Sequence, residues 1–96
     1  MRWTWDPAKA ALNRAKHGLS FETAVHVFDD PFHASKYDPH PDGDRWRTIG
    51  MIGPAVVLVV HTWPEAKFED DAPTGRIISA RKATPSERRV YEEGAF

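Results

Sequence analysis

Apolar and polar positions follow a helical period in the first third of the chain. Asp6 can cap a helix that begins at Pro7, and Gly18 provides a stop. The apolar positions between them follow i, i+3, i+4 and i+7 spacing: Ala8, Ala11, Leu12 and Ala15. This spacing predicts an amphipathic helix whose apolar stripe faces the core.

A second helix follows directly. Ser20 can cap it, and Pro31 ends it. Its apolar positions repeat the spacing of the first helix: Phe21, Ala24, Val25 and Phe28. Only a short turn separates the two helices, so the pattern predicts a helical hairpin.

The rest of the chain is typical of strands. Residues 32–37 predict a weak strand, 45–52 alternate in polarity, and 56–63 are nearly all apolar, as in a central strand. Residues 76–82 predict the last strand, and 3–5 a short edge strand. Breaker-rich loops at 38–44 and 64–73 separate these segments.

A final helix begins at a capping box, in which Thr84 and Glu87 can each satisfy a free backbone N–H. The predicted fold is therefore one α+β domain over residues 1–96. A short N-terminal strand and a helical hairpin pack on an antiparallel sheet of about four strands, with a C-terminal helix.

Positive charge is gathered in one segment. The chain has 13 Lys and Arg against 14 Asp and Glu, yet residues 75–89 carry five cations and one acid, Glu87. The cations are Arg76, Arg81, Lys82, Arg88 and Arg89. Such a local surface favours a polyanion such as RNA or DNA. Alternatively, the helix arginines pair with Glu92 and Glu93 and the strand is a solvated edge.

Strand alternation predicts the directions of these side chains. It places Arg76 and Lys82 on one face of the last strand, and Arg81 on the other. An arginine fork matches phosphate oxygens and can stabilise a phosphorane-like transition state without a metal.

The turn of the helical hairpin is a second candidate. Lys9, Asn13 and Lys16 share the predicted polar face of the first helix. His17 can exchange protons near neutral pH, and Glu22 could orient it. The alternative is a helix C-terminus at which cations favour the macrodipole.

Histidine and tryptophan give weaker signals. The five histidines show no recognised metal spacing, so we expect no metal or other cofactor. Trp3, Trp5, Trp46 and Trp63 could stack on bases, or fill the space between helices and sheet. In the second case Arg45 and Arg47 line the opposite face of their strand, where RNA would lie.

Other features bear on the compartment. The chain has no cysteine, its longest apolar run is too short to span a bilayer, and its N-terminus lacks the features of a signal peptide. We expect a cytoplasmic protein without membrane contact.

Six segments, in order, resemble the BrnT family of bacterial type II toxins. They are residues 5–9, 16–24, 27–31, 45–50, 76–84 and 87–92. The resemblance implies a RelE-like fold and a metal-independent endoribonuclease that arrests translation and growth. It also implies a hetero-oligomer with a BrnA-like antitoxin, which carries the DNA-binding part, so that DNA is contacted only indirectly.

The motifs of the family contain Lys16, His17, Arg76, Arg81, Glu87 and Tyr91. Our hypothesis makes Arg76 and Arg81 phosphate clamps, Lys16 and His17 groups that position substrate or move protons, and Tyr91 an assisting residue. The expected RNA-binding residues are Lys9, Arg45, Arg47, Lys82 and Arg88.

Two alternatives remain open. The basic surface could only dock an antitoxin or nucleic acid, without catalysis. A metal-dependent enzyme built on the histidines is the third possibility. The acidic loop 64–73 departs from the family pattern, and it would weaken RNA binding if it lay beside the RNA groove.

Overall fold

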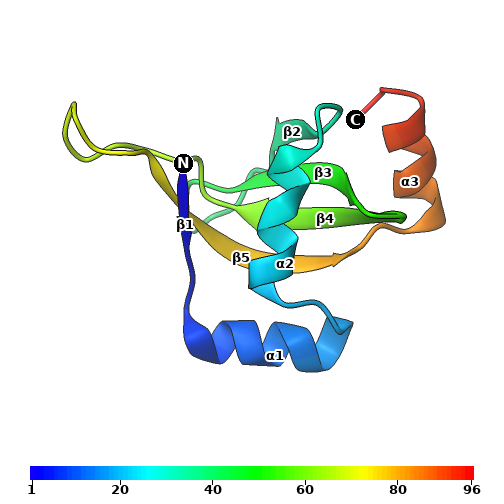
Figure 1. Ribbon diagram of the computed structural model, residues 1–96, viewed down its shortest axis with the longest axis horizontal. Helices are drawn as coiled ribbons and strands as arrows, with labels where there is room; N and C mark the ends of the chain where they lie inside the picture. The colour runs from blue at the N-terminus through cyan, green and yellow to red at the C-terminus, as the bar shows by residue number, and fades with distance from the viewer.

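A five-stranded sheet forms the centre of the computed structural model, which describes residues 1–96 (Figure 1). The strand order is β1-β5-β4-β3-β2. The strands are β1 (Arg2–Thr4), β2 (Ala34–Tyr37), β3 (Trp46–Ile52), β4 (Ala55–His61) and β5 (Thr74–Lys82). The helices are α1 (Pro7–His17), α2 (Phe21–Ala24), the 3-10 helix η1 (Val25–Asp29) and α3 (Pro85–Glu92).

This architecture confirms the predicted α+β class and the predicted caps and ends of the helices. The second predicted helix is α-helical only over Phe21–Ala24, however, and continues as the 3-10 helix η1. Asp6 caps α1, Gly18 ends it at φ 70°, and Ser20 caps α2. Thr84 and Glu87 form both hydrogen bonds of the capping box at the start of α3. The prediction of four antiparallel strands was incomplete, because β1 pairs parallel with β5. Their long separation in sequence makes the parallel arrangement possible.

The predicted buried face of α1 was wrong. Leu12 is 70% exposed, whereas Asn13 is buried. The Asn13 side chain accepts a hydrogen bond from the Ala80 backbone N–H at 3.1 Å and donates one to the Ala80 carbonyl at 2.8 Å. A polar side chain that satisfies two backbone groups of β5 thus fixes the rotation of α1, and the alanine stripe faces outward.

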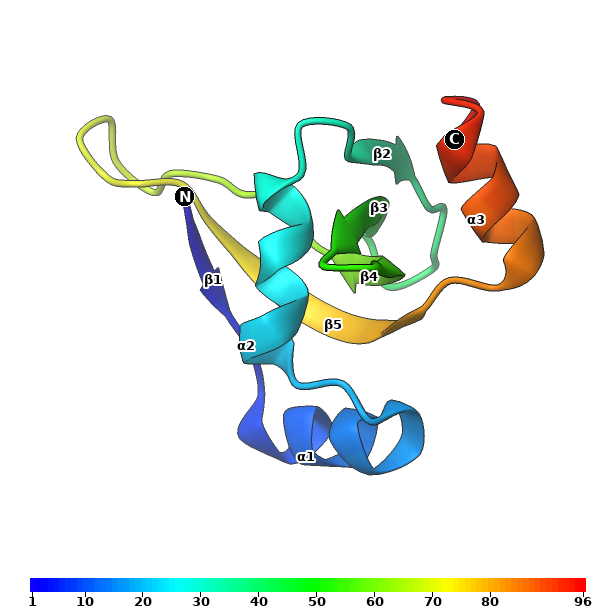
Figure 2. The ribbon, with the colours of Figure 1, turned by 45° about the vertical axis from the view of Figure 1, so that its right-hand side comes forward.

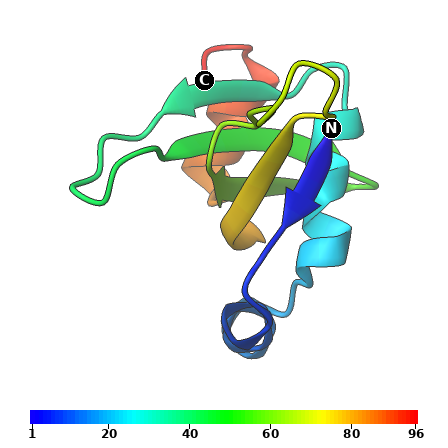
Figure 3. The same ribbon diagram turned by 90° about the vertical axis from the view of Figure 1, so that its left-hand side faces the viewer.

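The two faces of the sheet have separate apolar clusters. One joins α2 and η1 to alternate residues of β4 and β5, including Val57, Val59, Ile77 and Ala80. The other joins Val56 and Leu58 to Tyr91 and Phe96 at the C-terminal end. Accordingly, α2 and α3 lie on opposite faces of the sheet (Figure 3). We call the side that carries α3 the α3 face.

A β-bulge changes the phase of β5. Val60 of β4 pairs with Ser79, but the next residue, His61, pairs with Ile77, so Ile78 is the extra residue. Ile77 and Ala80, three positions apart, therefore reach the same apolar cluster. Their neighbours Arg76 and Arg81 both point to the α3 face. The predicted placement of these arginines on opposite faces was wrong.

The acidic loop 64–73 projects from the body as the end of a long β4–β5 hairpin (Figure 2). Residues 65–74 are exposed. Separately, none of the helices is both long and apolar enough to cross a bilayer.

Candidate nucleic-acid interface

A polar cleft of about 160 Å³ lies where the start of α1, the β2–β3 loop and β5 meet. Four of its lining side chains are basic or can become cationic: Lys9, His40, Arg45 and Arg76. Three carboxylates, Asp6, Asp42 and Asp44, also line the cleft. Most of the lining is polar, as expected of a site for a charged ligand.

The backbone places Lys9 and Arg76 near one another. Lys9 lies one turn before Asn13, whose two hydrogen bonds hold α1 against Ala80 of β5. The Arg76 backbone N–H donates to the Thr62 hydroxyl at 2.9 Å, which secures β5 beside the end of β4. The Arg76 side chain is exposed and forms no ion pair.

The β2–β3 loop contributes Arg45 and His40. Arg45 Nε donates to the Asp38 carboxylate at 3.0 Å, and the Asp38 N–H donates to the Arg45 carbonyl at 2.9 Å. These contacts close the base of the loop. His40 Nδ1 accepts the Asp42 backbone N–H at 3.1 Å and lies 3.5 Å from the Asp42 carboxylate.

Two of the three carboxylates in the cleft are engaged with the backbone. Asp6 accepts the N–H groups of Ala8 and Lys9 as the helix cap. Asp44 accepts the Trp63 N–H at 2.9 Å. Both carboxylates therefore hold the backbone in place, and the N–H donors partly offset their negative charge.

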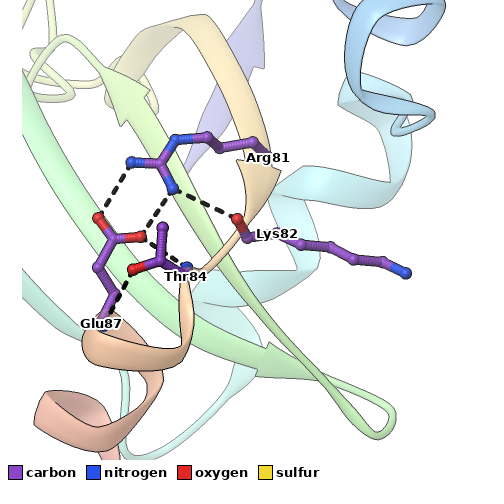
Figure 4. Close-up of polar contacts among 4 residues, drawn as sticks. All are labelled: Arg81, Lys82, Thr84 and Glu87. Atoms are coloured by element: carbon purple, nitrogen blue, oxygen red, sulfur yellow. Dashed lines mark hydrogen bonds and ion pairs between the residues drawn. The ribbon is translucent and has the colours of Figure 1, made fainter.

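Arg81 has very different surroundings from Arg76. Its guanidinium donates to both carboxylate oxygens of Glu87, at 2.7 and 3.0 Å (Figure 4). The hydrogen bond from Arg81 lowers the pKa of Glu87 to about 2 and raises the pKa of Arg81 above its ordinary value. Glu87 also accepts the Thr84 N–H of the capping box, so Arg81 ties β5 to the first turn of α3.

The other predicted RNA-binding residues are spread over the molecule. Lys82 points away from Arg81, as alternation predicts (Figure 4), and lines a separate shallow pocket with Arg88. Arg88 also forms the expected helix pair with Glu92 at 2.8 Å. Arg47 lies 3.9 Å from Asp38, and its buried Nε has no hydrogen-bond partner.

The predicted proton-transfer residues are not beside the cleft. Lys16 and His17 are at the opposite end of α1 from Lys9, and the cleft lining does not include them. The Tyr91 hydroxyl donates to the Asp30 carboxylate, which raises the tyrosine pKa to about 12. This bond joins α3 to the segment that follows η1. The structure thus groups Arg76 with Lys9 and Arg45, but not with Lys16, His17, Arg81 or Tyr91.

Sequence reasoning did not place His40 in the cleft that it lines. Its signal was present, since a histidine between two prolines in a loop next to Arg45 is a candidate for function. Elsewhere, no three or more His, Asp or Glu side chains converge as metal ligands do.

Fold and cleft together define a small α+β protein with a polar cleft in which cationic and anionic side chains both lie. Residues 5–87 match the family model described as the ribonuclease toxin, BrnT, of type II toxin–antitoxin systems. The chain belongs to this family. The comparison with curated proteins gave no match.

Proposed function

We propose that this protein is a metal-independent endoribonuclease toxin that is neutralised by a BrnA-like antitoxin. The family is described as a ribonuclease toxin of type II systems, which implies RNA as the target and an antitoxin as the partner. The observation that carries the proposal is the cleft, in which Lys9, His40, Arg45 and Arg76 meet from three separate elements.

In the proposed scheme, the side chains of the cleft promote cleavage without a metal. The 2′-hydroxyl oxygen attacks the adjacent phosphorus, its proton passes to solvent, and the bond from phosphorus to the 5′ oxygen breaks. The products are a 2′,3′-cyclic phosphate and a 5′-hydroxyl. Arg76, Lys9 and Arg45 stabilise the charge that develops on the phosphate oxygens.

His40 supplies the proton to the departing 5′ oxygen. Its Nδ1 accepts a backbone N–H, so the neutral ring carries its proton on Nε2. When the ring carries both protons, Nδ1–H no longer accepts the Asp42 N–H and faces the Asp42 carboxylate, 3.5 Å away, while Nε2–H is the proton transferred. Tyr91 has no step in this scheme, because its proton is engaged with Asp30 and its raised pKa disfavours donation.

The test is cleavage of a labelled RNA by the purified protein, with and without EDTA. We expect equal rates in both conditions, a cyclic phosphate end and no cleavage of 2′-O-methyl RNA. Loss of cleavage in EDTA that added metal restores would contradict metal independence. Binding without cleavage would favour the non-catalytic module.

A matched pair of variants tests the role of His40. His40→Ala is expected to slow cleavage by about 10²–10⁴-fold, the usual contribution of acid–base catalysis. His26→Ala is the control, because His26 also contacts a carboxylate, Asp29 at 3.0 Å, but lies on η1. Equal rates for the two variants would remove His40 from the mechanism.

The antitoxin part needs a separate experiment. Expression of the protein is expected to arrest growth, and coexpression of a BrnA-like antitoxin from the adjacent gene should relieve the arrest and copurify with the toxin. Arrest that persists despite a stable, coexpressed antitoxin would contradict the partner assignment.

A further inference from the structure

A second cavity, of about 270 Å³, lies on the face of the sheet opposite α3, at the base of the β4–β5 hairpin. Its wall includes Trp3, Phe28, His33, Ser35, His61 and Trp63. The cleavage scheme uses none of these residues. We propose that this cavity binds a single nucleobase that carries an exocyclic amine; the choice of RNA as its source rests on the proposed function.

Aromatic rings in mutual contact form the wall of the cavity. Trp3 and Phe28 stack with their ring centroids 4.4 Å apart and their planes at 14°. His61 meets both rings edge-on, with centroids 5.2 Å apart in each case. Gly75 leaves the space for Trp3, since a Cβ there would lie 2.5 Å from the indole. Planar aromatic surfaces of this kind stack on nucleobases.

Trp63 completes the wall from the hairpin. It is 47% exposed although it is a large apolar side chain, and it packs on Trp46 with centroids 4.5 Å apart. One side of the indole is thus held by protein, and much of its surface is open to a ligand. The volume of the cavity is below the range of about 300–1,000 Å³ for drug-sized ligands, so the occupant is small.

A chain of hydrogen bonds determines which atoms of the cavity wall are hydrogen-bond acceptors. His61 is buried, and its Nδ1 donates to the Thr62 carbonyl at 2.7 Å, so Nε2 is the acceptor in the neutral ring. Thr48 Oγ1 then donates to Nε2 at 2.6 Å and accepts from Ser35 Oγ at 2.6 Å. Burial lowers the pKa of His61, which agrees with a neutral ring. The Ser35 proton is engaged, so Ser35 Oγ offers its lone pairs.

His33 provides a second acceptor by the same reasoning. Its Nδ1 lies 2.6 Å from the Asp30 carbonyl and must donate to it, which leaves Nε2 with a lone pair in the neutral ring. The cavity therefore combines flat apolar walls with acceptors on one side. The complementary ligand is a planar ring that bears an N–H₂ donor, as adenine, cytosine and guanine do.

A hydrogen bond connects the cavity to the polar cleft. Asp44 lines the cleft, Trp63 lines the cavity, and the Trp63 N–H donates to the Asp44 carboxylate at 2.9 Å. This hydrogen bond joins the loop that borders the cleft to the residue that borders the cavity, round the end of the sheet. A strand whose phosphates lie in the cleft can place a neighbouring base over Trp63 and into the cavity.

The experiment measures binding of adenosine and purine riboside to the wild-type protein by titration, following the indole N–H signals of Trp3 and Trp63 by NMR. The two nucleosides have no phosphate, so the cleft contributes little. They differ only at C6, where adenosine has the exocyclic amine and purine riboside a hydrogen atom, and ring N1 is an acceptor in both. We expect adenosine to bind about fivefold more tightly, the effect of one ordinary hydrogen bond, since the acceptor side chains Ser35 and His33 are exposed. Equal binding, or no shift of either indole signal, would overturn the proposal.

Variants locate the site. Ser35→Ala should remove most of the preference for adenosine, because it deletes one acceptor. Trp63→Ala should weaken adenosine binding by about tenfold through lost stacking. Phe68→Ala is the matched control, since Phe68 is an exposed aromatic on the same hairpin outside the cavity wall. Weakening by Phe68→Ala equal to that by Trp63→Ala would overturn the assignment.

Two further arms separate the possible explanations. Indole carries an N–H but no exocyclic amine and imitates a tryptophan side chain of a protein partner; if it binds as tightly as adenosine, the cavity is a protein-docking site and the proposal fails. Arg76→Ala should retain adenosine binding while losing RNA cleavage. Adenosine binding in a protein that cleaves no RNA would leave the base site standing and refute only the nuclease, whereas cleavage without adenosine binding would refute only the base site.

Discussion

The two ends of β5 carry the same side chain on the same face, yet Arg76 and Arg81 have different surroundings. Arg76 lines a cleft with two other cations and has no carboxylate partner. Arg81 is held by both oxygens of Glu87. At about 3.3 Å per residue, the two lie about 16 Å apart, too far to hold one phosphate. Arginines that are close in sequence can therefore differ in role. Arg76 is available to a ligand, whereas Arg81 holds β5 to α3.

The largest expected effect separates the two arginines directly. Arg76→Ala should reduce the rate of RNA cleavage by about 10²–10³-fold, as for loss of a group that stabilises transition-state charge. Arg81→Ala should stay within about tenfold of the parent, because a phosphate must compete with Glu87 for Arg81. Single-turnover cleavage rates measure both effects, and circular dichroism verifies that the variants fold. A larger loss of cleavage in Arg81→Ala than in Arg76→Ala would contradict the assignment of the two arginines.

The next effect concerns Asn13, the residue that holds α1 against β5. Asn13→Ala should lower the free energy of unfolding by about 2–3 kcal/mol, because two backbone groups of Ala80 lose their partner. Leu12→Ala, one position away and 70% exposed, should change it by less than about 0.5 kcal/mol. Urea unfolding measures both. If Leu12→Ala lowered the free energy of unfolding more than Asn13→Ala does, the face of α1 that carries Leu12 and the alanines would be the buried one.

The Arg81 end predicts a dependence of stability on pH. The pKa of Glu87 is lowered from 4.5 to about 2 in the folded protein, so its contribution is present above pH 4.5 and is lost as pH falls from 4.5 toward 2. Glu87→Gln should cost about 1 kcal/mol at pH 7, since the partners are partly exposed, and should flatten this part of the pH profile. Glu92→Gln, which breaks only the exposed pair with Arg88, is the control. An equal loss of stability in Glu92→Gln would show that the Arg81–Glu87 pair contributes no more than an exposed pair.

The smallest effect concerns α3. Tyr91→Phe should leave RNA cleavage within about threefold and lower the free energy of unfolding by about 1 kcal/mol through the lost bond to Asp30. The pKa of Tyr91 is raised from 10 to about 12, so this contribution is present below pH 10 and is lost as pH rises toward 12. A loss of cleavage beyond tenfold with stability unchanged would return Tyr91 to the chemistry.

Local signals in the sequence predicted the elements well, since caps, prolines and glycines act on their near neighbours. The capping box of Thr84 and Glu87 and the end of α1 at Gly18 were both confirmed. The family resemblance was confirmed over residues 5–87. The caps and helix ends depend only on neighbouring residues. The family resemblance depends on many positions taken together.

The residues that line the cleft could not be predicted from the hydrophobic periodicity or from the spacing of residues in the sequence. The bulge at Ile78 is a pairing irregularity between β4 and β5, and it brought Arg76 and Arg81 to one face. Asn13 reversed the expected side of α1, because two hydrogen bonds to β5 outweighed a stripe of small alanines. His40 reached the cleft through the closure of its loop by Asp38 and Arg45. All three are tertiary contacts between distant segments.

The central claim is that RNA binds at the Arg76 end of the α3 face. The most direct measurement is an NMR titration of the wild-type protein with a short 2′-O-methyl RNA, which cannot be cleaved. We predict that the largest backbone amide shifts fall on residues 9, 40–45 and 76–78, around the cleft. Shifts confined to residues 16–22 or 81–88, with the cleft unchanged, would contradict it.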